Sequence, residues 1–193
     1  MVDLTEAIAS AMEPHLDQPF LLYGHSLGGL IAFEVSRLLG QRRVATPVHL
    51  ILGAVPSPDR LPRGHLHELP SPLLVRELRR MQGTPDMILQ DSEFLNLVLP
   101  ALRADFEVLE TYRFTAGAPL TCPITVYHGT QDGLVSEHDV VGWEAYSRRA
   151  FRLERVDAGH FFLDDPAFLG SFCRELLEIA DHAAFGNRAT VTK

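Results

Sequence analysis

Short apolar runs alternate with longer amphipathic segments along most of the chain. Four runs have the length and composition of buried strands, at residues 20–23, 47–56, 124–128 and 151–156. Around them, apolar residues recur every three or four positions, which is typical of amphipathic helices. Strands that alternate with helices predict an α/β protein, with a mostly parallel sheet and helices on both faces.

The segment 56–119 interrupts this alternation. It holds most of the chain's 13 prolines and several short helical patterns, but no convincing strand. We interpret it as a helical insertion into a single domain that spans residues 1–193. Sites in parallel α/β sheets lie at the carboxyl ends of the strands, so we expect the insertion to form a lid over such a site.

A serine stands between two glycines directly after the first predicted strand. Gly24, Ser26 and Gly28 form a G-x-S-x-G motif, and helical spacing begins at Leu27 and is predicted to stop at Gly40. A turn this tight leaves no room for side chains beside the serine, which explains both glycines. Strand, turn and helix are the context of a nucleophile elbow, so Ser26 is the candidate nucleophile.

A nucleophilic serine needs a base to accept its proton and an acid to orient that base. The loops after the third and fourth predicted strands offer Asp132 and His160, in the chain order that an elbow of this type requires. Asp157 competes with Asp132, but it lies in the same loop as His160 and is poorly placed to approach the ring from behind. The residues predict a Ser26–His160–Asp132 triad.

Two further histidine motifs receive structural interpretations. His25, inside the elbow, is expected to point away from the reacting face and to serve packing or supporting hydrogen bonds. The HLH motif at 65–67 has no third ligand nearby in the sequence, so we predict no metal site there.

Composition excludes several classes of function. The net charge of −8 argues against nucleic acid as a partner, because phosphate binding needs a basic face. No apolar run approaches the length of a membrane span, and no signal segment opens the chain. The two cysteines, Cys122 and Cys173, are interpreted as buried free thiols. We therefore expect a soluble cytoplasmic monomer.

Beyond the elbow, longer stretches resemble one family, the type II thioesterases of polyketide and nonribosomal peptide biosynthesis. The resemblance runs from about residue 3 to 180 and rests on GHSLGGLIAFEV, PALRADFEVLETYRF, CPITVYHGTQDGLVS and GHFFL. It implies an α/β-hydrolase fold and an enzyme that removes stalled or misprimed acyl groups from the phosphopantetheine arm of acyl or peptidyl carrier proteins, with no cofactor of its own.

The resemblance also implies roles for individual residues. Ser26 becomes the nucleophile, His160 the base and Asp132 its orienting acid, while the Leu27 backbone N–H donates to the oxyanion. Gly133 stands where the family usually has proline after the aspartate. A basic patch in the insertion (Arg76, Arg79 and Arg80) is expected to contact an acidic carrier protein, the alternative being an ordinary solvated helix face.

The amino-terminal region departs from the family pattern. Only one helix precedes Pro19, whereas a complete α/β hydrolase has several strands there, one of whose loops supplies the second oxyanion N–H. An N-terminally truncated domain with impaired activity is therefore one expectation. Three alternatives stay open: a carboxylesterase, an acyltransferase, or a non-catalytic carrier-binding protein.

Overall fold

The computed structural model describes residues 1–186, which form two compact units. The sheet unit comprises Val2–Arg60 and the chain from Ala116 onward, and the helical unit comprises Leu61–Thr115. The predicted insertion at 56–119 thus corresponds to the helical unit, whose boundaries lie four or five residues further in. Its role as a lid stays a prediction.

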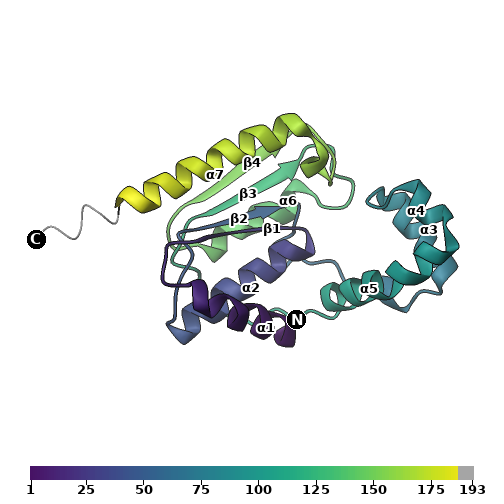
Figure 1. Ribbon diagram of the computed structural model, residues 1–193, viewed down its shortest axis with the longest axis horizontal. Helices are drawn as coiled ribbons and strands as arrows, with labels where there is room; N and C mark the ends of the chain where they lie inside the picture. The colour runs from purple at the N-terminus through teal and green to yellow at the C-terminus, as the bar shows by residue number, and fades with distance from the viewer. Residues whose placement is uncertain (187–193) are drawn as a thin grey trace, which may run out of the picture. The chain divides into compact units, whose positions relative to one another are not determined.

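Four parallel strands build the sheet of the described residues (Figure 1). Their order follows the chain: β1 (Leu21–His25), β2 (His49–Gly53), β3 (Ile124–Gly129) and β4 (Phe151–Val156). All four coincide with predicted runs, although β1 continues through Gly24 and His25, beyond the end of the predicted run at residue 23. The fold-class prediction of a parallel α/β sheet is confirmed.

The pairing register aligns the carboxyl ends of the strands. His25 pairs with Gly53, Gly53 with Tyr127, and Gly129 with Val156. The loops that follow β1, β3 and β4 therefore leave from one edge of the sheet. These are the loops that carry the three candidate catalytic residues.

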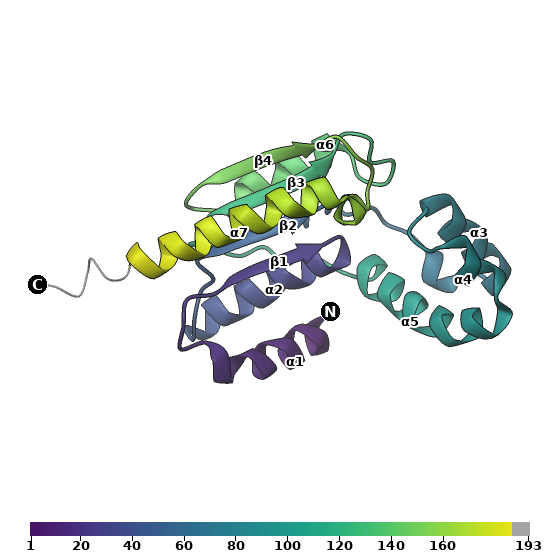
Figure 2. The same cartoon turned by 45° about the horizontal axis from the view of Figure 1, so that its top comes forward.

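Helices cover both faces of the sheet (Figures 1 and 2). On one face, α2 (Leu27–Arg42) packs on β1 and β2, and α1 (Val2–Met12) packs on α2 through Ala9, Val35 and Leu39. On the other face, α7 (Pro166–Gly186) places Phe168 and Phe172 against Tyr127. Apolar stripes at helical spacing explain both arrangements.

The end of α2 differs from the prediction. Gly40 lies inside the helix, which runs to Arg42, and Arg43 closes it in the left-handed conformation with φ 56°. A glycine within a helical pattern weakens the helix without having to end it, because packing compensates. Here the buried Leu39, beside Gly40, anchors the last turns in the core.

The remaining elements of the sheet unit are short. They are η1 (Glu13–His15), α6 (Glu137–Val141), η3 (Gly142–Tyr146) and η4 (Phe162–Asp164). Ser136 caps α6, since its side chain accepts from the Asp139 N–H. The indole N–H of the fully buried Trp143 donates to the Val55 carbonyl at 2.8 Å.

The helical unit is built around its own apolar core. It contains η2 (Leu66–Glu68), α3 (Ser71–Met81), α4 (Asp86–Gln90) and α5 (Ser92–Glu110). No strand occurs in it, as predicted. Its buried core residues are leucines from all three α-helices, namely Leu74, Leu78, Leu89 and Leu99.

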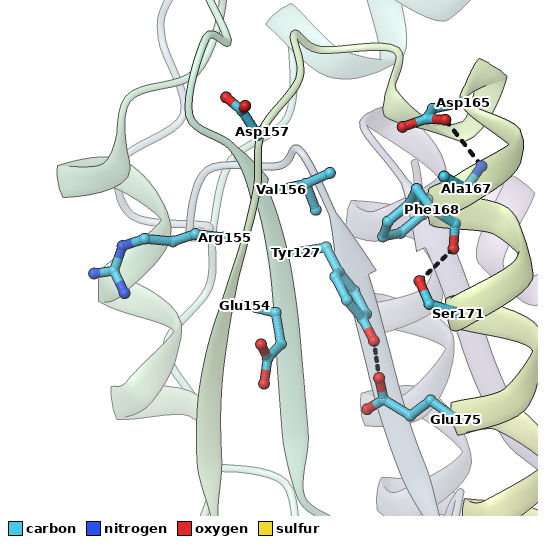
Figure 3. A pocket seen from close by; sticks show the side chains of 10 residues that line it. All are labelled: Tyr127, Glu154, Arg155, Val156, Asp157, Asp165, Ala167, Phe168, Ser171 and Glu175. Atoms are coloured by element: carbon cyan, nitrogen blue, oxygen red, sulfur yellow. Dashed lines mark hydrogen bonds between the residues drawn. The ribbon is translucent and has the colours of Figure 1, made fainter.

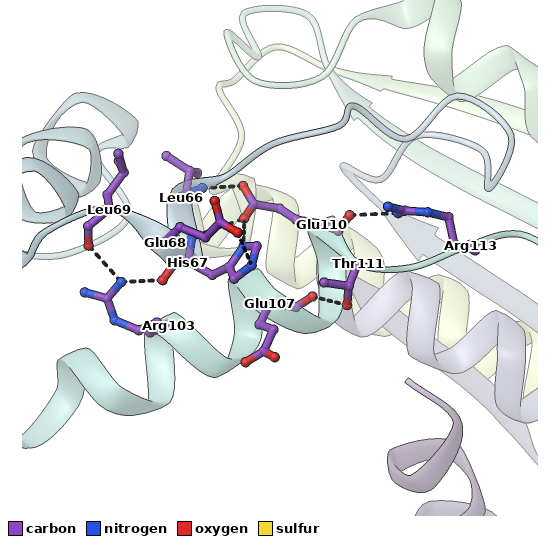
Figure 4. A network of polar contacts seen from close by, with 9 residues as sticks. All are labelled: Leu66, His67, Glu68, Leu69, Arg103, Glu107, Glu110, Thr111 and Arg113. Atoms are coloured by element: carbon purple, nitrogen blue, oxygen red, sulfur yellow. Dashed lines mark hydrogen bonds and ion pairs between the residues drawn. The ribbon is translucent and has the colours of Figure 1, made fainter.

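A buried carboxylate joins the two ends of the helical unit (Figure 4). Glu110, at the end of α5, accepts from the backbone N–H groups of Leu66 and His67 and from the His67 ring at 2.8, 3.1 and 2.5 Å. Arg103 donates to the carbonyls of His67 and Leu69. These bonds fix η2 on α5, so the HLH motif supplies part of a structural anchor.

The two cysteines differ in their exposure. Cys122 is buried, but Cys173 is exposed on α7, so the expectation of two buried thiols is wrong for Cys173. Both thiols are free, and burial raises the pKa of Cys122 to about 11. Among residues 1–186, no helix is both long and apolar enough to cross a membrane.

Candidate active site

Ser26 occupies a strained turn between β1 and α2. Its φ of 52° and ψ of −122° belong to a region that non-glycine residues rarely adopt. Its N–H donates to the Gly53 carbonyl at 2.8 Å, and its carbonyl accepts from the N–H groups of Gly29 and Leu30 at the start of α2. The end of β2 and the first turn of α2 therefore hold the turn from both sides, as a nucleophile elbow requires.

The glycines around Ser26 have different reasons to be glycine. A Cβ on Gly24 would lie 2.1 Å from the Gly28 carbonyl oxygen, so no side chain fits there. A Cβ on Gly28 would meet nothing within 4 Å, and the explanation of Gly28 by crowding is wrong. The second crowded position is Gly29, where a Cβ would lie 2.7 Å from Val55 Cγ1.

Asp132 and His160 come together as predicted. They leave the carboxyl edge on the loops after β3 and β4, and His160 Nδ1 lies 2.8 Å from Asp132 Oδ2. Both side chains are buried, with 8% of the His160 side chain and 0% of the Asp132 side chain exposed. Asp132 accepts the Nδ1–H, which leaves His160 Nε2 as the nitrogen available to take a proton.

The hydrogen bonds around Asp132 keep its carboxylate charged. Burial raises the pKa of this carboxyl, but the bonds from His160 and from the N–H groups of Leu134 and Val135 lower it more, so the pKa lies below its ordinary value. The competing Asp157 is exposed and instead accepts from Gln131 Nε2 at 3.0 Å. Asp132, and not Asp157, is thus the carboxylate that bonds to the His160 ring.

His25 lies closer to the base than the sequence indicated. Its ring centroid is 5.3 Å from that of His160, with the planes at 73°, and 5.0 Å from that of Phe162. The expectation of a packing role holds, but the side chain does not turn away from the base. Since Ser26 directly follows His25, this contact brings the elbow and the His160 loop together at the carboxyl edge.

The Leu27 N–H is suited to stabilise negative charge. It belongs to the first turn of α2, where backbone N–H groups lack intrahelical acceptors and the helix dipole is positive. No acceptor for it is found among residues 1–186. Its role as an oxyanion donor stays a prediction.

The predicted basic patch lies on α3. The side chains of Arg76, Arg79 and Arg80 are 71%, 52% and 63% exposed. Each also has a carboxylate within 4 Å, from Glu77 or Asp86. The patch is accessible, but these acids reduce its positive charge.

An open pocket of about 490 Å³ lies elsewhere on the sheet unit (Figure 3). Residues of β3, β4 and α7 line it, among them Tyr127, Glu154 and Phe168, and the Tyr127 hydroxyl donates to Glu175. None of the three candidate catalytic residues lines this pocket. Within the described part of the chain, no group of three or more His, Cys, Asp or Glu residues is arranged to hold a metal ion.

Comparison with known proteins adds to this geometry. A family model described as "Thioesterase domain" matches residues 1–178. The chain belongs to this thioesterase family. The resemblance noted in the sequence is therefore confirmed, and with it the α/β-hydrolase fold class.

The relatives of this thioesterase-family chain include a gramicidin S biosynthesis protein and a thioesterase. Gramicidin S biosynthesis protein GrsT of Aneurinibacillus migulanus is 34% identical over 177 residues, which cover 90% of this chain and 69% of GrsT. Thioesterase PikA5 of Streptomyces venezuelae is 37% identical over 164 residues, which cover 84% of this chain and 58% of PikA5.

Solved structures show the same relationship. YbtT, a type II thioesterase from the yersiniabactin NRPS/PKS biosynthetic pathway, matches with a TM-score of 0.82 at 30% identity. The match covers 94% of this thioesterase-family chain and 74% of YbtT. The chain thus spans between 58% and 74% of the length of these three proteins.

Proposed function

We propose that the chain is a serine thioesterase that hydrolyses acyl thioesters on the phosphopantetheine arm of carrier proteins, and that it edits stalled or misprimed polyketide and nonribosomal peptide synthases. The hydrogen bond between Asp132 and His160, at the sheet edge that carries the strained Ser26, is the observation on which this rests. Membership of the thioesterase family and the pathways of its relatives support the substrate class.

Hydrolysis proceeds in two half-reactions. Ser26 Oγ attacks the thioester carbonyl while His160 Nε2 accepts the hydroxyl proton, and the tetrahedral intermediate collapses to acyl-Ser26. The departing thiolate takes the proton from His160. Water, deprotonated by His160, then attacks the acyl-serine, and the second tetrahedral intermediate collapses to the free acid as His160 returns the proton to Ser26 Oγ. Asp132 stabilises the imidazolium formed in each half-reaction.

The negative oxygen of each intermediate needs donors. The Leu27 N–H supplies one, and loss of a single oxyanion donor typically costs about 10² to 10³ in rate. A thiolate is a good leaving group, so the chain needs to provide less help to the departing group than an amidase does. The substrate itself brings the phosphopantetheine, and no step requires a bound metal or cofactor.

The carrier protein is the proposed macromolecular partner, in the cytoplasm where such synthases work. The exposed arginines of α3 would meet its acidic surface, and the helical unit would act as the lid. Charge complementarity of this kind affects encounter rate and orientation more than intrinsic reactivity.

Thioester hydrolysis on an acylated carrier protein tests the proposal. We expect release of free acid by the wild-type chain and its loss in Ser26→Ala, with Ser36→Ala on α2 as a matched serine control. Oxygen esters of the same acyl group should react more slowly, and a hydroxyl acceptor should not divert the acyl group from water. Hydrolysis that survives in Ser26→Ala, or faster cleavage of the oxygen ester, would contradict the proposal.

A further inference from the structure

We infer that His25 is a positioning residue, whose neutral ring holds the base His160 in place beside the elbow. The inference rests on the proposed function, because it concerns the geometry of the same base. It assigns a task to a residue that the two half-reactions leave without one.

Aromatic packing provides the first argument. The His25 ring meets the His160 ring edge to face at 5.3 Å and the Phe162 ring at 5.0 Å, so it touches two residues of the loop that carries the base. Edge-to-face contacts favour one relative ring orientation. Asp132 holds one nitrogen of His160, and the His25 ring limits rotation and tilt of the imidazole around that bond.

The surroundings of His25 fix its own position. The Tyr23 hydroxyl lies 3.3 Å from His25 Nδ1. A Cβ on Gly53 would lie 2.8 Å from that nitrogen, 2.9 Å from the Tyr23 hydroxyl and 3.1 Å from Phe162. The His25 ring, the Tyr23 hydroxyl and Phe162 thus leave no room for a side chain at Gly53. The Gly53 carbonyl also accepts a hydrogen bond from the Ser26 N–H.

The electrostatic state of His25 suits this task. Burial and, to a smaller extent, positive charge on His160 lower the pKa of His25 to about 4, although the His160 backbone, Asp132 and Asp164 raise it by smaller amounts. His25 thus stays neutral near pH 7 and does not repel the imidazolium that His160 becomes. Its Nε2 is buried and makes no hydrogen bond of ordinary geometry.

Modification of Ser26 by a fluorophosphonate measures activation of the serine without any thioester substrate. We expect His25→Asn, which removes the ring, to lower the rate about 10- to 100-fold, because small misplacements of catalytic groups have effects of this size. His25→Phe should restore most of the rate. His49 lies at the start of β2, at the end of the strand opposite to Gly53, and His49→Asn should react like the wild type. Circular dichroism should show that all variants are folded.

A second measurement separates this inference from the proposed function. Proton NMR follows solvent exchange of the His160 Nδ1–H that bonds Asp132, and we expect faster exchange in His25→Asn and in Gly53→Ala, where the new methyl displaces the His25 ring. If the wild type resists the fluorophosphonate, the proposed function fails, and the exchange rates still decide the role of His25. If His25→Asn is labelled by the fluorophosphonate at the same rate as the wild type and its Nδ1–H exchanges at the same rate, the inference is overturned.

Discussion

Ser26 combines the candidate nucleophile with a backbone conformation that costs free energy. A non-glycine residue in such a region typically costs about 1–3 kcal/mol. Glycine at this position removes the strain, so we expect Ser26→Gly to be about 1 kcal/mol more stable than Ser26→Ala, as measured by urea unfolding. In an ordinary helix the order is reversed.

Ser36, inside α2 and fully buried, is the matched control. There the free energy of unfolding of Ser36→Ala should be about 1 kcal/mol higher than that of Ser36→Gly, because glycine lowers helix stability. The same order at both positions would show that the Ser26 turn stores no strain.

Asp132 links the stability of the fold to pH through its hydrogen bonds. Its pKa is lower in the folded chain than in the unfolded one, so its contribution to stability is present above the unfolded pKa of about 3.9 and is lost as the pH falls through the folded pKa. Asp132→Asn should lower hydrolysis by about 10³ to 10⁴ at pH 7. Its stability deficit, from urea unfolding, should be constant between about pH 5 and 8 and shrink below about pH 4.

Asp157→Asn is the control for this pH dependence, because Asp157 is exposed and accepts hydrogen bonds from the side chains of Thr130 and Gln131. It should change the free energy of unfolding by less than about 0.5 kcal/mol at any pH. A deficit of Asp132→Asn that stays unchanged at pH 3 would mean that the charge of Asp132 is not what stabilises the loop.

The elbow as an element depends on close approach between β1 and α2. Gly24→Ala puts a methyl group 2.1 Å from the Gly28 carbonyl, and we expect it to lower the free energy of unfolding by about 3 kcal/mol or more. Gly28→Ala meets open space and should leave stability within about 1 kcal/mol of the wild type. Thermal unfolding distinguishes the two, and equal losses would contradict the geometry.

The helical unit depends on Glu110 for the attachment of η2 to α5 (Figure 4). Glu110→Ala leaves the N–H groups of Leu66 and His67 without their acceptor, so we expect a loss of about 3 kcal/mol and faster amide exchange at these two residues. Glu110→Gln should keep part of the network. Glu107→Ala, on the exposed side of α5, should behave like the wild type, and a similar loss there would mean that the hydrogen bonds of Glu110 are not what stabilises the unit.

The net charge of the whole chain is negative, which makes a local basic surface informative. The net charge is −8, so a proposed acidic partner must be met by local positive charge such as that of Arg79 and Arg80. Their reversal to Glu should raise KM for an acyl carrier protein about tenfold and leave small thioesters unaffected. Reversal of Arg148 and Arg149, exposed on the sheet unit, is the control. Equal effects on both substrates would exclude a docking role for the α3 patch.

Much of the sheet unit could be predicted because its signals are local. Each of the four strands, and the elbow turn as well, is formed by its own run of consecutive residues. Asp132 and His160 each follow a strand at the same sheet edge. Apolar runs, helical spacing and the G-x-S-x-G motif reflect burial and backbone sterics at each position, which sequence patterns record directly. The sequence by itself therefore determined the fold class and the identity of the candidate triad.

Contacts between distant segments decided the rest. The His25 ring meets His160 across 135 positions of the chain, Gly29 is crowded by Val55, and Glu110 reaches back to Leu66. No periodicity or motif in the sequence encodes such long-range contacts, because they depend on strand register and on how each helix is rotated against its neighbours. Only the tertiary structure could show that Gly28 is uncrowded, that acids accompany the arginines of α3, and that His25 packs against the base.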